Sequence, residues 1–297
     1  MSPRFSLRQL EFFVAVADAG SVSAGAERCG ASQAGVSLAI KDLERHLGVQ
    51  LLVRRRAKGA ALTEAGNRVL VDARRLLEGA TELQDLASAQ DNRVSGTLSV
   101  GCYVTLAPFL IPPVLDDFAS RHPDLDVRVV EGAADEVREA VLDGRCELGF
   151  LYDNDGAGVA LSSVTVRTSR PYVILAADHP LAGRKAISLA EIAGEPLIMF
   201  DVPSARNAAQ MLAEAGLTPN LRHLSSNIEV VRCLVARGVG YSILVQQWPT
   251  DVSFEGRPVV SLPILDPTRE RRAVLAWPEK ARLTRRARAL VEFCRTL

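Results

Sequence analysis

The sequence lacks the spacing patterns that mark several common classes of protein. Its five cysteines are scattered, and no two of them have the Cys-x-x-Cys spacing of a zinc site. Its four histidines follow no recognisable metal-ligand or triad spacing, and the chain has neither a P-loop nor a Gly-x-Gly-x-x-Gly motif. We therefore expect neither an enzyme nor a metalloprotein, and we predict no cofactor.

A long apolar run is also missing. The apolar stretch at residues 12–17 is too short for a membrane span or for the core of a signal peptide. Scattered cysteines in odd number are typical of a protein kept in a reducing compartment. These absences predict a cytoplasmic protein with no membrane partner.

A cationic segment is present in a chain whose net charge is zero. Residues 1–60 hold nine Lys and Arg against five acids, so the rest of the 297-residue chain carries the compensating negative charge. Such asymmetry is expected when one domain meets phosphate and another does not. The length allows two or three domains.

Three short helices are predicted in the cationic segment, over residues 7–19, from Ser21 or Ser23 to Cys29, and from Ser32 onward. In the third, the apolar positions fall on one face, which predicts burial of Val36, Ile40, Leu43 and Leu47. The opposite face carries Ala34, Ser37, Leu38, Lys41 and Arg45. A helix of this kind after a tight turn suits insertion into a DNA major groove, and a small bundle with a solvated charged face is the alternative.

Residues 49–63 are predicted to form a β-hairpin, with arms at 49–53 and 60–63. Four of the six residues at its tip are cationic, namely Arg54, Arg55, Arg56 and Lys58. A cationic hairpin after a helix-turn-helix is typical of a wing that reaches phosphates or the minor groove. The alternative is that the basic tip serves solubility. We predict a winged helix-turn-helix DNA-binding domain over residues 1–63.

A long helix is predicted over residues 64–90. Its small and large apolar residues repeat every four and three positions, which is a heptad seam. The seam consists of Val69, Ala73, Leu76, Ala80, Leu83 and Ala87. Pairing with the same helix of a second copy is the predicted use, and packing on its own domain is the alternative. Residues 91–96 are polar with a glycine and are predicted to form a hinge.

From residue 97 the pattern changes to short apolar runs that alternate with helices, beginning β-α-β-α-β, which predicts an α/β fold with parallel strands. A faint repeat matches residues 137–144 to residues 231–238, each a helix closed by glycine before an apolar run. We therefore predict two similar lobes in a domain over 97–297. Lobe 1 takes about 97–165 and 270–297, and lobe 2 takes about 166–269. A small ligand is expected in the cleft between them.

The order of motifs in residues 7–66 resembles the DNA-binding domain of LysR-type transcriptional regulators. The matching text includes Leu7-Arg8-Gln9-Leu10-Glu11, Ser32-Gln33, Ile40-Lys41-Asp42-Leu43-Glu44 and Leu62-Thr63-Glu64-Ala65-Gly66. The rest of the chain is similar to the family in layout, with a linker helix, a hinge and a two-lobe effector domain like that of periplasmic binding proteins.

The resemblance implies a homodimer or homotetramer that binds an interrupted palindrome in double-stranded DNA and answers to a small-molecule effector, with RNA polymerase as a further possible partner. It implies DNA contacts by Ser32, Gln33, Ala34, Ser37, Leu38 and Lys41, and by Arg54 in the minor groove. Two positions depart from the family. Ala34 stands where proline is common and Leu38 where arginine is common, so an apolar contact with a thymine methyl is expected at Leu38.

The resemblance also implies an effector site lined by Tyr103, Val104, Thr105, Gly132, Tyr152, Asp153, Asp201, Ser204 and Asn227. Thr105 and Ser204 are predicted at helix starts, where an anion is favoured, although each would serve equally as an ordinary cap. Asp153 and Asp201 argue against a simple anion and for an amine or a hydroxyl, unless they cap loops.

Two other functions are weighed against a regulator with a small-molecule effector. Cys102 near the cleft would suit a redox-sensing regulator, but a small buried hydrophobe is the preferred interpretation of that residue. A solute-binding protein for transport would use the same two lobes, but the N-terminal segment and the missing signal peptide oppose it.

Overall fold

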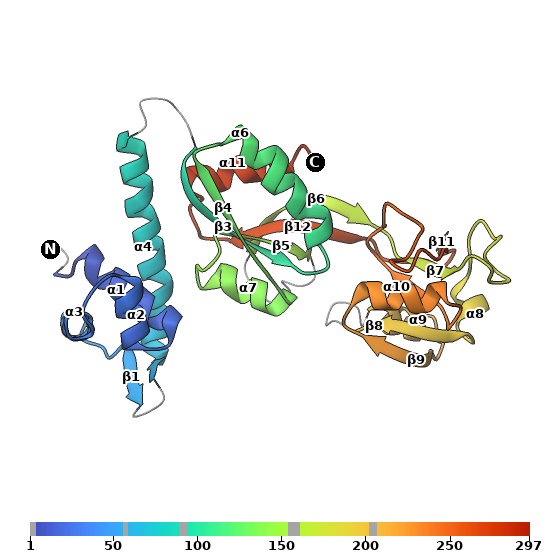
Figure 1. The fold of residues 1–297 in the computed structure, drawn as a ribbon, viewed down its shortest axis with the longest axis horizontal. Helices are drawn as coiled ribbons and strands as arrows, with labels where there is room; N and C mark the ends of the chain where they lie inside the picture. Colours follow the sequence, from blue (N-terminus) through green and yellow to red (C-terminus); the bar gives the residue numbers. More distant parts are fainter. Residues whose placement is uncertain (1–3, 56–58, 89–93, 154–160, 202–206) are drawn as a thin grey trace.

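The molecule has three parts, a small helical domain, one long helix and two α/β lobes (Figure 1). The computed structural model describes residues 4–55, 59–88, 94–153, 161–201 and 207–297. Arg56, Lys58, Ser204 and residues 91–93 of the predicted hinge lie outside these ranges. No helix in the described part of the chain is long and apolar enough to cross a membrane.

The N-terminal domain contains the three predicted helices, α1 (Leu7–Ala19), α2 (Val22–Arg28) and α3 (Gln33–Leu47). Each begins after a serine whose hydroxyl accepts a backbone N–H of the first turn, and these serines are Ser6, Ser21 and Ser32. The predicted stripe of α3 is confirmed, because Val36, Ile40 and Leu43 are buried and Leu47 packs against them.

Close packing of α1 on α2 depends on Gly25. A Cβ atom at this position would lie 2.6 Å from the Cγ2 atom and 2.7 Å from the Cα atom of Val16. The absence of a side chain therefore lets the two helix backbones approach to the distance that the helix-turn-helix needs.

The predicted hairpin is present but begins later than expected. Strand β1 (Leu52–Arg55) pairs antiparallel with β2 (Gly59–Leu62). The backbone N–H groups of Leu51 and Leu52 donate to the carboxylate of Glu44 on α3, at 2.8 and 3.1 Å. This contact holds the start of the hairpin against α3, so the first arm is shorter than the apolar run predicts.

The long helix α4 (Glu64–Ser88) packs its first turns on α1 of its own domain. Ala73 is buried there and Val69 is half-buried, so these two positions of the predicted dimer seam are directed into the protomer itself. The prediction of a continuous seam is therefore wrong at Ala73. Leu76 and Leu83 are 51% and 68% exposed and Ala80 is half-buried, whereas the side chain of Ala87 lies outside the description.

Lobe 1 is a five-stranded sheet in the order β4-β3-β5-β12-β6. The first three strands are parallel and confirm the predicted β-α-β-α-β unit, while β12 is antiparallel to both neighbours. The strands are β3 (Gly96–Tyr103), β4 (Leu125–Gly132), β5 (Leu148–Tyr152), β6 (Leu161–Ser169) and β12 (Arg271–Pro278). The late strand and the last helix return to this lobe, as predicted.

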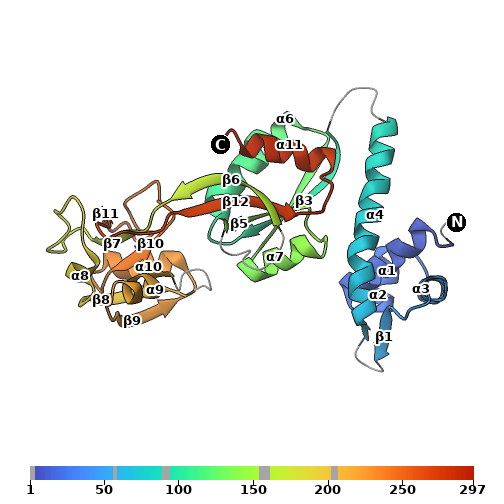
Figure 2. The same cartoon turned by 180° about the vertical axis from the view of Figure 1, so that it is seen from behind.

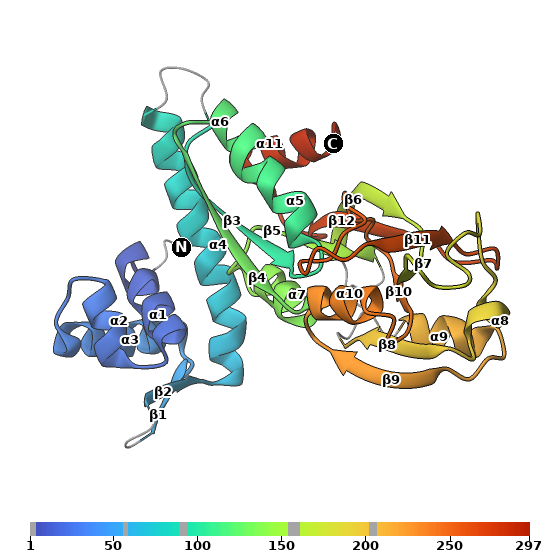
Figure 3. The same cartoon turned by 45° about the vertical axis from the view of Figure 1, so that its right-hand side comes forward.

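Helices cover both faces of the lobe 1 sheet (Figure 3). They are α5 (Ala107–Pro113), α7 (Ala134–Leu142), α11 (Arg285–Cys294) and the short α6 (Ala119–Arg121). The helical segment between β3 and β4 is divided, because a π-helical segment (Val114–Phe118) follows Pro112 and Pro113 and separates α5 from α6.

Lobe 2 repeats this plan. Strands β10 (Ser242–Leu244) and β11 (Val259–Pro263) flank β7 (Tyr172–Ala176), and β8 (Pro196–Phe200) pairs with β9 (Asn220–Ser225). A bridge between Leu197 and Tyr241 joins the two groups of strands. The helices are α8 (Leu189–Ile192), α9 (Asn207–Glu214) and α10 (Ile228–Ala236).

The faint sequence repeat has a structural counterpart. Helices α7 and α10 are followed by Gly144 and Gly238, with φ angles of 74° and 73°, and each turn leads into the next strand of its lobe. Strands β6 and β12 run side by side from lobe 1 toward lobe 2 (Figure 2). The prediction of two similar lobes is confirmed by this layout.

Candidate DNA-binding surface and interlobe pocket

The face of α3 opposite its buried stripe is open to solvent. Gln33, Ala34 and Lys41 are exposed, and Leu38 is 62% exposed although it is apolar. Ser37 is half-buried on the same helix. The predicted groove-facing residues therefore lie together on one accessible helical surface.

Two residues at the start of α3 have defined local roles. The Ser32 hydroxyl accepts the N–H of Gly35 at 3.1 Å, so this side chain caps the helix. The Ser23 hydroxyl donates to the Gln33 side-chain oxygen at 3.0 Å. That bond ties α3 to α2 and limits the directions in which the Gln33 amide can point.

The wing lies beside this surface. The N–H of Ala60 donates to the Gly20 carbonyl at 2.8 Å, which attaches β2 to the turn between α1 and α2. In the hairpin, Arg54 pairs with Ala60 and Arg55 pairs with Gly59. The backbone of the wing is thus fixed to both helices of the helix-turn-helix, α2 through the turn and α3 through Glu44.

A cavity of about 790 Å³ lies between the two lobes. Most of its wall is apolar, with contributions from lobe 1, lobe 2 and the crossover strands. The lining includes Val104, Thr105, Pro108, Phe109, Ile111, Glu131, Tyr152, Phe200, Met211, Asn227, Ile243, Val245, Gln246, Trp248 and Arg271.

Four predicted effector residues line this cavity, namely Val104, Thr105, Tyr152 and Asn227. Of these, Asn227 also caps α10, since its side-chain oxygen accepts the N–H of Glu229 at 2.9 Å. Thr105 is not a cap, because α5 begins after Leu106 without a side-chain cap. Instead, the Thr105 hydroxyl is buried and has no hydrogen-bond partner among the described residues.

The other residues that were predicted for the effector site and that the structure describes do not line the cavity. Tyr103 is fully buried behind it, with its ring edge-to-face against Tyr152 at 6.1 Å. At Gly132 a Cβ atom would meet the Glu136 carboxylate at 2.8 Å, so this position faces α7. Asp153 pairs with Arg272 at 3.0 Å, and Asp201 is exposed. Local contacts therefore direct Tyr103, Gly132 and Asp153 away from the cavity, whereas Asp201 is open to solvent.

Polar groups gather at one wall of the cavity. Gln246 donates its side-chain N–H to the Tyr152 hydroxyl at 2.9 Å, and the Arg271 guanidinium lies over the Tyr152 ring at 5.0 Å. Both Gln246 and Arg271 are buried, at 7% and 9% exposure. The side-chain oxygen of Gln246 has no partner among the described residues. The wall therefore presents a cation, a hydroxyl and an unused acceptor.

Sequence reasoning missed Gln246, Trp248 and Arg271. Gln246 follows strand β10 and Arg271 begins β12, so their positions at strand ends are the available signal. Trp248 packs edge-to-face on Phe109 of lobe 1, with ring centroids 5.4 Å apart. The aromatic pair forms part of the apolar wall and connects the two lobes.

Cys102 is fully buried next to Tyr103. Burial raises the pKa of the Cys102 thiol far above its usual range, and the negative charge of Glu131 raises it further. The thiol is therefore protonated and poorly reactive, which agrees with the interpretation of Cys102 as a small hydrophobe. No cluster of three metal-ligating side chains occurs in the part of the chain that the structure describes.

A winged helix-turn-helix, a long connecting helix and two lobes around a pocket define the class of transcriptional regulators that bind DNA and contain a domain for a small-molecule effector. Residues 7–67 match the model of the bacterial regulatory helix-turn-helix protein, lysR family, and residues 91–297 match the LysR substrate binding domain. The chain belongs to the LysR family of bacterial transcriptional regulators.

Three relatives illustrate the similarity. The chain is 30% identical to the HTH-type transcriptional regulator TtuA of Agrobacterium vitis over 263 residues, which cover 86% of this chain and 85% of TtuA. It is 28% identical to the dual regulator OxyR of Escherichia coli, over 98% of this chain and 95% of OxyR. The crystal structure of HinK, a LysR family transcriptional regulator from Pseudomonas aeruginosa, is 32% identical over 98% of each chain, with a TM-score of 0.65.

Proposed function

We propose that this regulator binds an interrupted palindrome in double-stranded DNA as a homodimer or a homotetramer, and that an organic acid bound between its lobes controls it. The observation that carries the proposal is the presence, in one chain, of an accessible α3 surface fixed to a wing and of a pocket with unused polar groups. The proposed partners place the protein in the cytoplasm, with RNA polymerase as a further contact at the promoter.

In the proposed DNA complex, α3 enters the major groove. Gln33, Ser37 and Lys41 offer hydrogen-bonding groups to base edges and phosphates, and the exposed Leu38 offers an apolar contact for a thymine methyl. The wing supplies Arg54, Arg55, Arg56 and Lys58 to the adjacent backbone or minor groove. Phosphate contacts of this kind fix the register, while the α3 side chains read the sequence.

The proposed dimer uses the part of α4 beyond its own domain. Leu76 and Leu83 lie one heptad apart, and both are about half or more exposed, at 51% and 68%. Ala80 lies between them and allows close approach of a second helix. The contact surface proposed here therefore begins at Leu76 rather than at Val69.

The pocket favours a ligand with an apolar body and one acidic group. Arg271 supplies a buried positive charge and the Thr105 hydroxyl can donate to an anion, while the free side-chain oxygen of Gln246 can accept from a ligand donor. Phe109, Trp248 and the aliphatic lining would enclose the apolar body. Asp153 and Asp201 do not line the cavity, whereas Glu131 does, so we expect the acidic group of the ligand to lie at Arg271 and away from the Glu131 carboxylate.

Selection of random DNA duplexes by the full-length chain tests the DNA-binding part of the proposal. We expect enrichment of an inverted repeat with an interrupted centre, and loss of that enrichment for the Lys41→Ala, Leu38→Ala double variant. Enrichment of no sequence by the folded wild-type protein would refute sequence-specific binding.

A further inference from the structure

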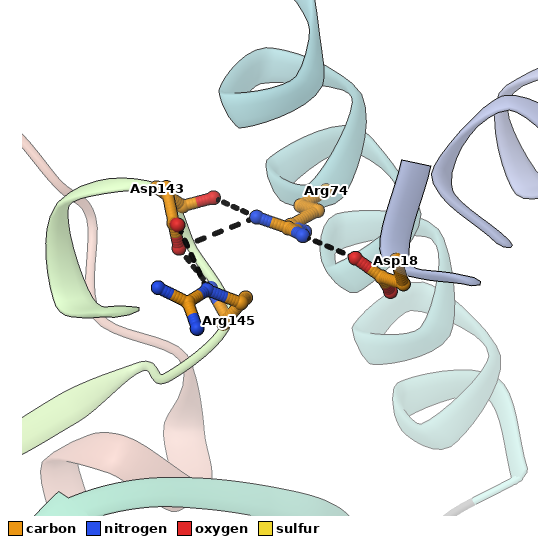
Figure 4. A network of polar contacts seen from close by, with 4 residues as sticks. All are labelled: Asp18, Arg74, Asp143 and Arg145. Carbon is orange, nitrogen blue, oxygen red and sulfur yellow. Dashed lines mark hydrogen bonds and ion pairs between the residues drawn. The ribbon is translucent and has the colours of Figure 1, made fainter. Parts of the chain in front are cut away.

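Arg74 on α4 contacts both neighbouring parts of the molecule (Figure 4). One terminal nitrogen donates to the Asp18 carboxylate on α1 at 2.5 Å. The other donates to the backbone carbonyl of Asp143 at 2.6 Å and lies 3.3 Å from the Asp143 carboxylate. Asp143 follows α7 in lobe 1, so a single side chain joins the winged domain, the linker helix and the effector domain of one protomer.

The environment of Arg74 makes these contacts costly to break. The side chain is 8% exposed, and a buried guanidinium that loses a carboxylate partner keeps its desolvation cost without the compensating charge. Asp143 is held in turn by Arg145, whose side chain donates to its carboxylate at 2.8 Å and whose backbone N–H donates to it at 3.1 Å. The Asp143 carboxylate is therefore held in place beside the Arg74 guanidinium.

Backbone shape brings the lobe 1 turn close enough for this contact. Gly144 adopts a φ angle of 74°, which side-chain-bearing residues rarely adopt. Its Cβ position would lie 3.5 Å from the Cβ atom of Arg74 and 3.9 Å from the carbonyl oxygen of Val71. The turn thus rests directly on α4 and encloses the aliphatic stem of Arg74.

The contact between α4 and lobe 1 continues one helical turn further. Glu78 and Gly79 of α4 share a cavity of about 430 Å³ with Glu147 and Thr284 of lobe 1. Glu147 is itself buried and paired with Arg286 of α11 at 2.7 Å. Lobe 1 therefore meets α4 through an extended polar surface, of which the Arg74 network is the part that also reaches the winged domain.

The same lobe carries the pocket at its opposite end. Strand β5 begins after this surface and ends at Tyr152, and β12 begins at Arg271 and ends at Pro278, next to it. Because β5 and β12 are paired along their length, lobe 1 is one body between the pocket and α4. A side chain that links lobe 1 to the winged domain therefore restricts the movement of these two parts relative to each other.

We propose that Arg74 is a positioning residue that fixes the winged domain to lobe 1 of the same chain and so sets the orientation of α3 relative to the pocket. This fixed orientation depends on contacts within one chain and requires neither ligand nor DNA. Its consequence, transmission of ligand binding to the DNA-binding surface, rests on the proposed function.

Small-angle X-ray scattering of the full-length protein tests this positioning role without ligand or DNA. The variants are Arg74→Met, Asp18→Asn and Asp143→Asn, and light scattering is used to compare samples of equal oligomeric state. Arg68→Met is the matched control, because Arg68 lies on the same helix, is 70% exposed and pairs with Glu64 at 2.7 Å.

We expect a larger radius of gyration and a broader distance distribution for Arg74→Met than for the wild type, with smaller changes for the two aspartate variants. The Arg68→Met control should match the wild type. Scattering curves of Arg74→Met, Asp18→Asn and Asp143→Asn that superpose on the wild type would overturn the proposal. If Arg74→Met does not fold, the two aspartate variants decide, because each keeps the buried arginine and one of its partners.

A second measurement separates positioning from general stability. In a double-mutant cycle, Asp18→Asn and Asp143→Asn should be non-additive in their effect on the scattering curve, because both act through Arg74 and do not contact each other. Additive effects would contradict the role of Arg74. If the two aspartate variants are non-additive but the wild type selects no DNA sequence, the proposed function is refuted and the positioning role of Arg74 is retained.

Discussion

The hydroxyl of Tyr152, at the end of β5, accepts a 2.9 Å hydrogen bond from the side-chain amide of Gln246, which follows β10. The two residues are 94 positions apart, and the bond is buried. It is one of the direct polar links between lobe 1 and lobe 2 at the pocket wall. Removal of either partner should therefore change both the stability and the ligand response of the effector domain.

Tyr152→Phe is expected to destabilise the protein by about 1–3 kcal/mol, because the Gln246 amide would then be buried with neither its donor nor its oxygen paired within the described structure. Tyr241→Phe is the matched control. The Tyr241 hydroxyl is buried and has no partner among the described residues, so its removal should be neutral or stabilising. Urea denaturation of both variants measures the difference, and equal losses would contradict the importance of the Tyr152 bond.

Arg271→Gln should weaken the binding of an organic acid by roughly ten- to a hundredfold, the cost of one charge-assisted hydrogen bond. Sodium benzoate and neutral benzamide are suitable probes in a thermal-shift titration, and only benzoate should depend on Arg271. Arg272→Gln is the neighbouring control, because that side chain pairs with Asp153 outside the cavity. Stabilisation of wild-type protein by benzamide but not by benzoate would exclude an anionic ligand.

Lys41→Ala should lower DNA affinity and reduce the slope of log affinity against log salt by about one, the effect of one lost phosphate contact. The measurement uses a duplex recovered by selection and a series of salt concentrations. Arg170→Ala serves as the control, since Arg170 is exposed on the effector domain and pairs with Glu270. An unchanged slope for Lys41→Ala would remove this residue from the phosphate backbone.

Leu76→Asp and Leu83→Asp are each expected to shift the protein from dimer to monomer in sedimentation velocity, because a charge would enter the proposed helix–helix contact. Both side chains are exposed in the protomer, so the variants should fold normally. Thr81→Asp places the same charge at another exposed position of α4 and should remain dimeric. A stable dimer in both leucine variants would assign the self-association to a different surface.

The contact between α4 and lobe 1 should depend on pH through Glu78. Burial raises the pKa of Glu78 from 4.5 to about 7, and the negative charge of Glu147 adds to the rise. The guanidinium groups that face Glu78 act in the opposite direction, and they belong to Arg286, Arg75 and Arg74.

A carboxyl group with a raised pKa binds its proton more tightly in the folded, docked state. Its contribution to stability is therefore complete below pH 4.5 and is lost as the pH rises toward 7. We expect the melting temperature of the wild type to fall more between pH 5 and pH 8 than that of Glu78→Gln. Glu64→Gln, at an exposed site of the same helix, should retain the wild-type pH dependence.

Local patterns were sufficient to predict the helices of the N-terminal domain, since a capping serine, a 3.6-residue period and a terminal glycine act within a few residues. The alternation of strands and helices similarly predicted both lobes. Strand β11 was missed, because its short run between prolines is held mainly by pairing with β7. The burial of Ala73 in its own N-terminal domain was not predicted either. A heptad pattern shows that one face of α4 is apolar, but it does not show whether that face packs on the same protomer or on a second copy.

The pocket and the Arg74 network depend on contacts between distant positions. Arg74 and Asp143 are 69 residues apart, and Arg271 meets Tyr152 only because β12 returns to lobe 1 beside β5. The strand ends named by the family resemblance include Thr105, Tyr152 and Asn227, which line the cavity because parallel strands bring their carboxyl ends together. They did not distinguish side chains that face the cavity from those, such as Tyr103, that face the core.

The glycine turn after α7 in lobe 1 and the corresponding turn after α10 in lobe 2 have different environments. The Cβ position of Gly144 contacts Arg74, whereas that of Gly238 has no described atom within 4 Å. Lobe 1 therefore packs through this turn against α4, which is joined to the winged domain. The corresponding turn of lobe 2 makes no such contact with the described residues. When a ligand brings the lobes together, we expect lobe 1 to stay fixed relative to α4 and lobe 2 to move the greater distance.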